Sequence, residues 1–118
     1  MRIAIAGSSG RMGRSLIEAV LNAGDMQLAA ALDQAGSPFL GKDAGELVGA
    51  PCGVTITDDF DSALANADCL IDFTRPAGTL AHLASCHKRG VAMVIGTTGL
   101  ETEQKLLIQD AAHSIPVV

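Results

Sequence analysis

Residues 3–14, which read IAIAGSSGRMGR, decide the fold of this chain. The apolar run from Ile3 to Ala6 predicts a buried parallel strand, and three glycines spaced three residues apart follow it directly. Residues 15–22 place apolar side chains at helical spacing and predict a helix. A strand, a glycine-rich turn and a helix in this order are typical of the phosphate-binding start of a dinucleotide fold.

Each glycine of this stretch has a physical reason. Gly7 lets the chain turn sharply out of the strand, Gly10 lets a pyrophosphate approach the backbone, and Gly13 lets the helix lie close to the sheet. The first N–H groups of the helix then face the phosphates. The spacing is G-x-x-G-x-x-G rather than the commoner G-x-G-x-x-G, and the alternative is a turn that merely joins a strand to a helix.

A second apolar strand is expected at residues 27–32, and it ends in Asp33, twenty residues after Gly13. A dinucleotide fold places there the acid that binds the adenosine ribose hydroxyls; the alternative is an aspartate that caps the strand end. Gln34 is neutral, and Asp33 would repel a 2′-phosphate, so the charges favour NADH. Dual use with NADPH stays open, because Arg11 or a lysine such as Lys42 offers positive charge.

Composition narrows the class of protein. A single domain of 118 residues with 48% hydrophobic residues can bury an aliphatic core. The net charge of −5, without a run of Lys or Arg, argues against binding to nucleic acid or to an anionic membrane. Three separated cysteines give neither a disulfide framework nor a zinc pattern, and no leader or membrane span is evident. We therefore expect a cytoplasmic protein with reduced thiols.

The rest of the chain predicts further alternating strands and helices. After an irregular surface excursion over 35–53, we expect strands at 54–56, 69–73, 91–95 and 114–118, and helices from 58–59 to about 66, from 76 to 87 or 88, and over 101–112. The acidic cluster at 58–61 is interpreted as helix capping rather than a metal site. His82 and Cys86 share a helix face, and we expect a packed cysteine beside a surface histidine rather than zinc.

The ends of two later strands carry polar groups. The turn from Gly96 to Gly99, with Thr97 and Thr98, offers hydroxyls and N–H groups at the carboxyl edge of the sheet, where this class of fold binds ligands. The alternative is a helix cap. The chain stops as a sixth strand begins, so we expect a cofactor-binding domain at 1–118 whose substrate and oligomerisation domain lies outside this sequence.

Three stretches resemble one family, the bacterial dihydrodipicolinate reductases of lysine and diaminopimelate biosynthesis. They are AGSSGRMG at 6–13, IDFTRPAGT at 71–79 and VIGTTG at 94–99. The resemblance covers the whole chain but only the family's N-terminal half. It implies cofactor contacts from Gly7, Ser8, Ser9, Gly10, Arg11, Met12, Asp33, Phe73, Arg75, Gly96, Thr97 and Thr98, with Thr98 also facing the substrate.

Two residues depart from the family pattern. Ser8 replaces a usual alanine, which should be tolerated, and Gln34 replaces an arginine that holds the 2′-phosphate in many members. The implied reaction is hydride transfer from NADH or NADPH to a cyclic imine dicarboxylate, which converts 4-hydroxy-tetrahydrodipicolinate to tetrahydrodipicolinate. The family's histidine general acid and substrate-binding lysine would lie outside the chain. We expect cofactor binding without turnover from 1–118 alone, no catalytic residue or metal within it, and a homotetramer for the full protein.

Two other functions share this opening. One is an NAD(H)-sensing module of a regulator, which leaves the second and third stretches unexplained. The other is a related oxidoreductase such as an aspartate dehydrogenase. In each case the expected fold is a doubly wound α/β sheet of Rossmann type, with strand order 3-2-1-4-5-6 and right-handed crossovers.

Overall fold

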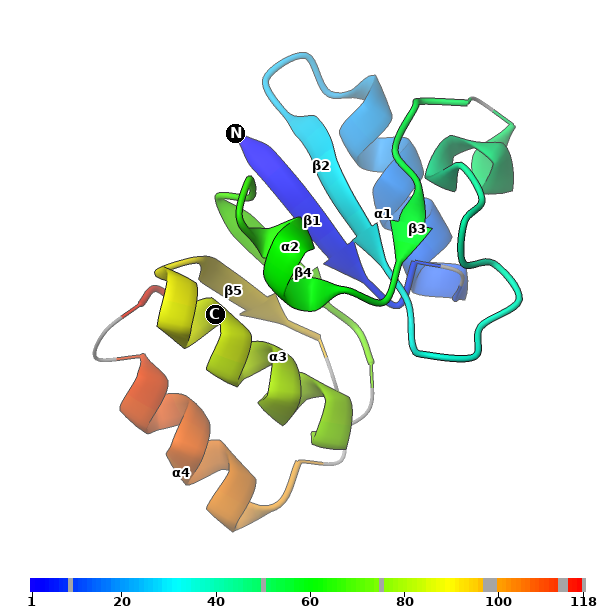
Figure 1. The fold of residues 1–118 in the computed structure, drawn as a ribbon. Coiled ribbons are helices and arrows are strands. Elements are labelled where there is room, and N and C mark those ends of the chain that lie inside the picture. The colour runs from blue at the N-terminus through cyan, green and yellow to red at the C-terminus, as the bar shows by residue number, and fades with distance from the viewer. Residues whose placement is uncertain (9, 50, 75, 97–99, 113–114, 118) are drawn as a thin grey trace.

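The structure is a computed structural model, and it describes residues 1–118 except 9, 50, 75, 97–99, 113–114 and 118. A parallel five-stranded sheet with the order β3-β2-β1-β4-β5 forms its centre (Figure 1). The elements in chain order are β1 (Arg2–Ala6), α1 (Arg11–Asn22), β2 (Gln27–Leu32), the 3-10 helix η1 (Ala44–Val48), β3 (Ile56–Thr57), α2 (Phe60–Leu64), β4 (Cys69–Asp72), α3 (Pro76–Arg89), β5 (Ala92–Ile95) and α4 (Thr102–Ala111).

Helices cover both faces of the sheet, which explains why its central strand β1 is apolar on both sides. Ile3 and Ile5 pack with the buried residues of α1 and η1 on one face. Ala4 and Ala6 point to the opposite face, where they join the cluster formed with α2, α3 and α4. The alternation of side chains along one strand therefore divides the core into two layers.

The expected strand order is confirmed for the five strands. Next to β5 the described residues show an isolated parallel bridge between Met93 and Val117, where the sixth strand was expected. The Met93 N–H donates to the carbonyl of Pro116 at 2.9 Å.

Three boundaries of helices and strands differ from expectation by two residues or more, and the others by at most one. Helix α1 begins at Arg11 rather than at 15, and α2 ends at Leu64 rather than near 66. Strand β3 begins at Ile56 rather than at 54, because the preceding residues pair elsewhere. The Val54 carbonyl accepts from the Ala44 N–H at 2.8 Å, and Thr55 forms an antiparallel bridge with Asp43.

The expected surface excursion over 35–53 is organised by the carboxylate of Asp43. Its Oδ1 accepts from the backbone N–H groups of Gly45 and Cys52 at 2.7 and 3.0 Å, and its Oδ2 accepts from that of Gly53 at 2.7 Å. These bonds favour the charged form and lower the pKa of Asp43 to about 2, with the backbone bonds from Cys52 and Gly53 contributing most. Part of this excursion is not surface at all, because Ala44 is fully buried in the layer beside α1.

A buried serine links β1 to β2 through two hydrogen bonds of its hydroxyl group. The Ser8 Oγ donates to the Ile5 carbonyl at 2.9 Å and accepts from the Leu32 N–H at 2.9 Å. Both partners are main-chain groups at the ends of neighbouring strands. The hydroxyl therefore bonds to a main-chain acceptor and a main-chain donor inside the core, where polar groups need a hydrogen-bond partner.

We predict that Asp43→Asn lowers the melting temperature at neutral pH and weakens its acid dependence. The lowered pKa means that the wild-type carboxylate stabilises the fold fully above its ordinary pKa of 3.8, and that this stabilisation is lost as the pH falls towards about 2. Melting curves from pH 7 to pH 2 of both proteins, with Asp58→Asn as an exposed control, measure it. Parallel curves for the wild type and Asp43→Asn would contradict the prediction.

We predict that Ser8→Ala lowers the free energy of unfolding by about 1 to 3 kcal/mol, because the buried Leu32 N–H loses its acceptor. The matched control is Ser15→Ala, since the exposed Ser15 hydroxyl also bonds to a carbonyl, that of Arg11 at 3.2 Å. Its loss should cost no more than about 0.5 kcal/mol. Urea unfolding measures both variants. Equal losses in the free energy of unfolding would show that the buried hydrogen bonds of Ser8 stabilise the fold no more than the exposed one of Ser15.

Candidate nucleotide-binding site

The chain leaves β1 through a tight turn, which begins the glycine loop (residues 7–13, with 9 outside the described residues). Gly7 has a φ of +78°, a left-handed conformation that favours glycine. The N–H groups of Gly7 and Ser8 both donate to the Leu32 carbonyl, at 2.9 and 3.0 Å, and the Gly10 N–H donates to the Gly7 carbonyl at 3.0 Å. The sharp turn expected at Gly7 is therefore present, and it is tied to the end of β2.

Gly13 lies against the backbone of the same loop. A Cβ at this position would overlap the Gly7 carbonyl oxygen and would lie 2.8 Å from both the Gly7 carbonyl carbon and the Ser8 Cα. The close approach expected of Gly13 is therefore made to the loop rather than to the sheet. At Gly10, among the described residues, only the Gly7 oxygen lies within 4 Å of a Cβ position, at 3.3 Å, so the backbone there is open to a ligand.

Helix α1 starts at the carboxyl edge of the sheet with its first N–H groups free of partners within the helix. Its N-cap residue is Gly10, which has no side chain to satisfy them. Arg11 and Met12, in the first turn, are exposed, Met12 by 50%. This end of the helix can accept an anion. The cofactor contact expected of Ser8 is wrong, because Ser8 is fully buried and both its hydroxyl and its N–H are bonded within the protein.

Asp33 follows β2 at the same edge of the sheet. Its Oδ1 accepts from the Gln34 N–H and its Oδ2 accepts from the Ser37 Oγ, each at 2.9 Å. The Ser37 Oγ in turn accepts from the Phe39 N–H at 3.2 Å. The acid is half-buried and held in place, while Gln34 is exposed beside it.

Two cations lie near the ring of Phe39, the residue whose N–H bonds to Ser37. The Arg14 guanidinium carbon is 5.5 Å, and the Lys42 Nζ is 5.8 Å, from the centre of the Phe39 ring. Sequence reasoning singled out Lys42 but missed Arg14 and Phe39. The position of Arg14, in the first turn of the helix that follows Gly10, is the signal that could have identified it.

The ends of β4 and β5 bring together two more expected site residues. The Gly96 N–H donates to the Asp72 carbonyl at 2.7 Å. The Phe73 ring lies so close to Gly96 that a Cβ there would overlap it, and Phe73 is 37% exposed. The expected residues Ser9, Arg75, Thr97 and Thr98 lie outside the described residues.

The turn at Gly7 also contacts the residues that follow β4. A Cβ at Gly7 would lie 3.4 Å from both the Phe73 carbonyl oxygen and the Thr74 Cγ2. The glycine loop therefore contacts the β4–α3 turn (residues 73–75, of which 73 and 74 are described). A ligand lying across this edge would reach both segments.

His82 differs from expectation. It was expected at the surface, but its side chain is only 12% exposed, and its Nδ1 lies 2.9 Å from the Oδ2 of the fully buried Asp72. Cys86 is buried as expected, and burial raises the pKa of its thiol to about 12, with smaller contributions from Cys69 and Asp72. Among the residues that the structure describes, no group of three or more His, Cys, Asp and Glu side chains is placed to hold a metal ion.

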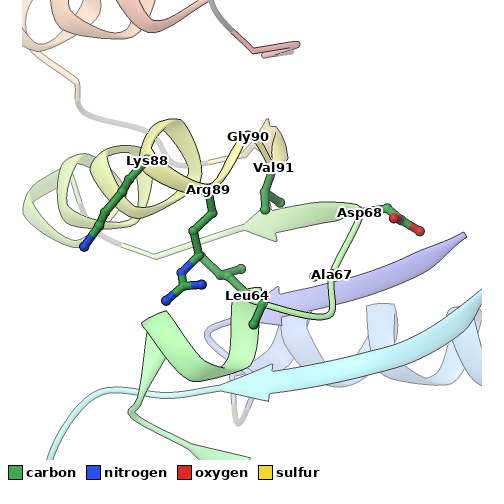
Figure 2. A pocket seen from close by; sticks show the side chains of 8 residues that line it. Leu64, Ala67, Asp68, Lys88, Arg89, Gly90 and Val91 are labelled. Atoms are coloured by element: carbon green, nitrogen blue, oxygen red, sulfur yellow. The ribbon is translucent and has the colours of Figure 1, made fainter.

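A pocket of about 450 Å³ opens at the opposite, amino edge of the sheet (Figure 2). Its lining includes Asp68 and Val91, which precede β4 and β5, and the cations Lys88 and Arg89 at the end of α3. In Figure 2 the Asp68 carboxylate points away from both cations. The pocket is therefore separate from the glycine loop and from Asp33.

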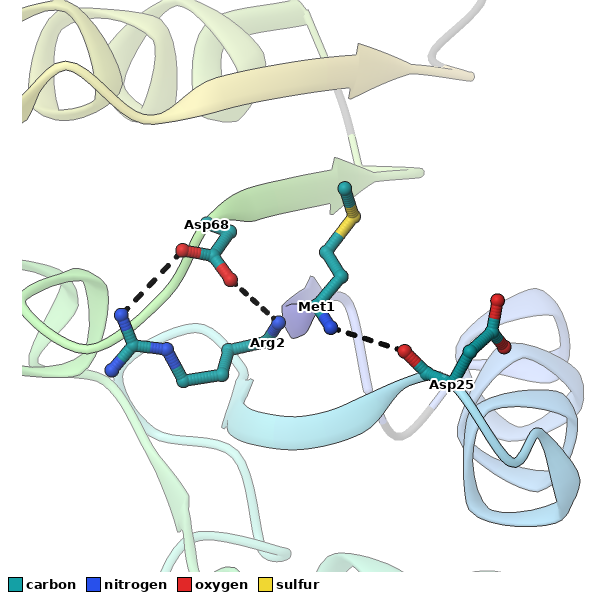
Figure 3. A network of polar contacts seen from close by, with 4 residues as sticks. All are labelled: Met1, Arg2, Asp25 and Asp68. Carbon is teal, nitrogen blue, oxygen red and sulfur yellow. Dashed lines mark hydrogen bonds and ion pairs between the residues drawn. The ribbon is translucent and has the colours of Figure 1, made fainter.

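The amino edge is closed by contacts of the first residues (Figure 3). The N-terminal ammonium of Met1 donates to the Asp25 carbonyl at 3.0 Å. The Arg2 N–H donates to the Asp68 Oδ2 at 2.8 Å, and the Arg2 guanidinium lies 3.5 Å from Oδ1. The backbone bond from Arg2 is the main cause that lowers the pKa of Asp68. Within the described ranges, no helix has the length and apolarity needed to cross a bilayer.

Known proteins are similar to this chain in sequence and in fold. The chain is 57% identical over 118 residues to the 4-hydroxy-tetrahydrodipicolinate reductase of Nitrosomonas europaea, and 61% identical over 117 residues to that of Dechloromonas aromatica. These alignments cover 100% and 99% of the chain but 44% of each relative, so the chain spans less than half of their length.

Solved structures agree with the fold. A dipicolinate-bound dihydrodipicolinate reductase from Paenisporosarcina sp. TG-14 superposes with a TM-score of 0.71 at 29% identity, over 96% of this chain and 42% of that one. An amine dehydrogenase from Mycobacterium smegmatis superposes with a TM-score of 0.72 at 23% identity, over 94% and 37%, which shows the fold alone. The family model described as dihydrodipicolinate reductase, N-terminus, matches residues 1–118. The chain therefore belongs to the dihydrodipicolinate reductase family, whose N-terminal region it matches along its whole length.

Proposed function

We propose that this chain binds a reduced nicotinamide dinucleotide across the carboxyl edge of its sheet. The pyrophosphate lies at the glycine loop and the start of α1, the adenosine ribose at Asp33, and the nicotinamide beside Phe73 and Gly96. The observation that carries this proposal is the contact of the Gly7 turn with the β4–α3 turn, at 3.4 Å from a Cβ position. It makes one continuous surface from segments more than sixty residues apart in sequence.

The longer protein, in this proposal, reduces 4-hydroxy-tetrahydrodipicolinate to tetrahydrodipicolinate in lysine and diaminopimelate biosynthesis. When bound, the reduced nicotinamide supplies a hydride from C4. The names of the relatives support this reaction, and the Paenisporosarcina structure holds dipicolinate, a cyclic dicarboxylate. Thr98 is the substrate contact within this chain, and the proton donor comes from the remainder of the protein. We also propose that the full protein is a homotetramer. We propose a cytoplasmic location for it, in keeping with the free thiols of Cys52, Cys69 and Cys86.

We further propose that NADH is preferred over NADPH. Asp33 is a held anion beside the neutral Gln34, and both features disfavour a 2′-phosphate. Arg14 and Lys42 at the Phe39 ring supply the opposing charge, so NADPH remains a weaker ligand rather than an excluded one.

We predict that the chain binds NADH more tightly than NADPH, and that Asp33→Ala reverses this order. Loss of the hydrogen bonds to the ribose should weaken NADH binding about tenfold, whereas NADPH gains from the removed repulsion. Isothermal titration calorimetry with both cofactors measures this. Asp25→Ala, at the other end of the same strand, is the control. Equal or tighter NADPH binding by the wild type would assign the 2′-phosphate contact to Arg11, Arg14 or Lys42 instead.

We predict that Gly13→Ala abolishes measurable NADH binding and lowers the free energy of unfolding by about 1 to 3 kcal/mol, since the new methyl group must displace the Gly7 carbonyl. Gly24→Ala is the matched control, because a Cβ at Gly24 meets nothing within 4 Å. Calorimetry and urea unfolding of the two variants give both quantities. A Gly13→Ala protein that binds NADH normally would place the pyrophosphate away from this loop.

A further inference from the structure

The carboxylate of Asp72 is fully buried at the end of β4, a position flanked by β1 and β5. Burial of a charge is costly unless it is paired and hydrogen-bonded. Oδ1 accepts from the Thr74 N–H at 3.0 Å, and Oδ2 lies 2.9 Å from the His82 Nδ1. The main-chain oxygen of Asp72 accepts from the Gly96 N–H at 2.7 Å. One residue therefore joins the β4–α3 turn, helix α3 and the end of β5.

His82 is fixed from two directions. Its ring stacks on the Phe60 ring at the start of α2, with centroids 4.0 Å apart and an interplanar angle of 15°. Its Nδ1 lies 2.9 Å from the Oδ2 of Asp72, which is hydrogen-bond distance. The stacking on Phe60 restricts rotation of the ring. If the ring left Asp72, the buried side chain of Asp72 would lose a hydrogen-bond partner.

The segment between these two residues carries the proposed nicotinamide contacts. A Cβ position at Gly78 lies 3.0 Å from the Thr74 Oγ1 and 3.6 Å from the His82 Cε1, so the Thr74 side chain lies over α3 beside the histidine. On its other side, Thr74 contacts Gly7 through its Cγ2, and the preceding Phe73 places its ring on Gly96. The position of the β4–α3 turn thus depends on Asp72 and on the helix that His82 anchors.

We propose that Asp72 and His82 form a positioning pair that holds the β4–α3 turn against Gly7 and Gly96, so that the surface for the nicotinamide half of the cofactor is formed before binding. This inference rests on the proposed function. His82 is a positioning residue, because it acts through Asp72 and the turn. A preformed surface gains affinity by removing the ordering cost that a mobile turn would impose on binding.

The test compares NADH with ADP-ribose, which lacks the nicotinamide ring, by calorimetric titration of the chain. His82→Leu removes the bond to Asp72, and we expect its Kd for NADH to rise about tenfold while its Kd for ADP-ribose stays within about twofold of wild type. His82→Asn, whose amide can donate near the Nδ1 position, should restore most of the NADH affinity. His87→Leu, on the exposed face of α3, should change neither ligand.

Should His82→Leu fail to fold, His82→Gln replaces it, because its amide reaches the Nε2 rather than the Nδ1 position and is better tolerated near a carboxylate. Unchanged NADH affinity in the folded variant overturns the proposal. So does an equal loss for NADH and ADP-ribose, which would indicate general damage to the fold, or a His82→Asn protein as weak as the one it should rescue. A wild-type chain that binds neither ligand overturns the proposed function itself.

Discussion

The close contact between Gly13 and the carbonyl of Gly7 is the constraint on which the rest of the structure depends. It brings the first turn of α1 against the backbone of the turn that leaves β1, with no side chain between them. The direction of α1 then fixes which sheet face Ile17 and Val20 cover, and where its first N–H groups point. The same close packing that builds one core layer therefore also places the anion-accepting end of the helix at the edge of the sheet.

Much of this arrangement could be predicted because it follows from local patterns. Apolar runs predicted the strands, and the strand, glycine-rich turn and helix at the start of the chain predicted the strand order of a dinucleotide fold, which the structure has for its five strands. The boundaries that were wrong depend on partners distant in sequence. Strand β3 starts late because Val54 bonds to Ala44, and periodicity within 54–56 carries no information about a residue ten positions earlier.

The expected site residues also divide into those predicted from local patterns and those whose partners are distant in sequence. Gly7, Phe73 and Gly96 lie at one edge, where the strand ends of a parallel sheet meet, and their roles in binding stay predictions. The roles of Ser8 and His82 were missed, because their partners are Leu32 and Asp72. A usable signal existed for the second: an aspartate ending an apolar strand that is covered on both faces requires a donor, and His82 follows ten residues later on the next helix.

The charge of the chain sets a last condition on a dinucleotide site. A net charge of −5 repels a ligand with two phosphates at long range. At physiological salt this repulsion is screened beyond about 8 Å, so groups near the ligand decide whether it binds. In the proposed site, those groups are the helix terminus at Gly10 with Arg11, and the two cations at Phe39. The carboxylates of Asp33, Asp43 and Asp72 each accept a hydrogen bond from a backbone or side-chain donor. An acidic protein can therefore present a local surface that accepts an anion, because these three carboxylates already accept hydrogen bonds and Arg11 and Arg14 lie in the first turn of α1.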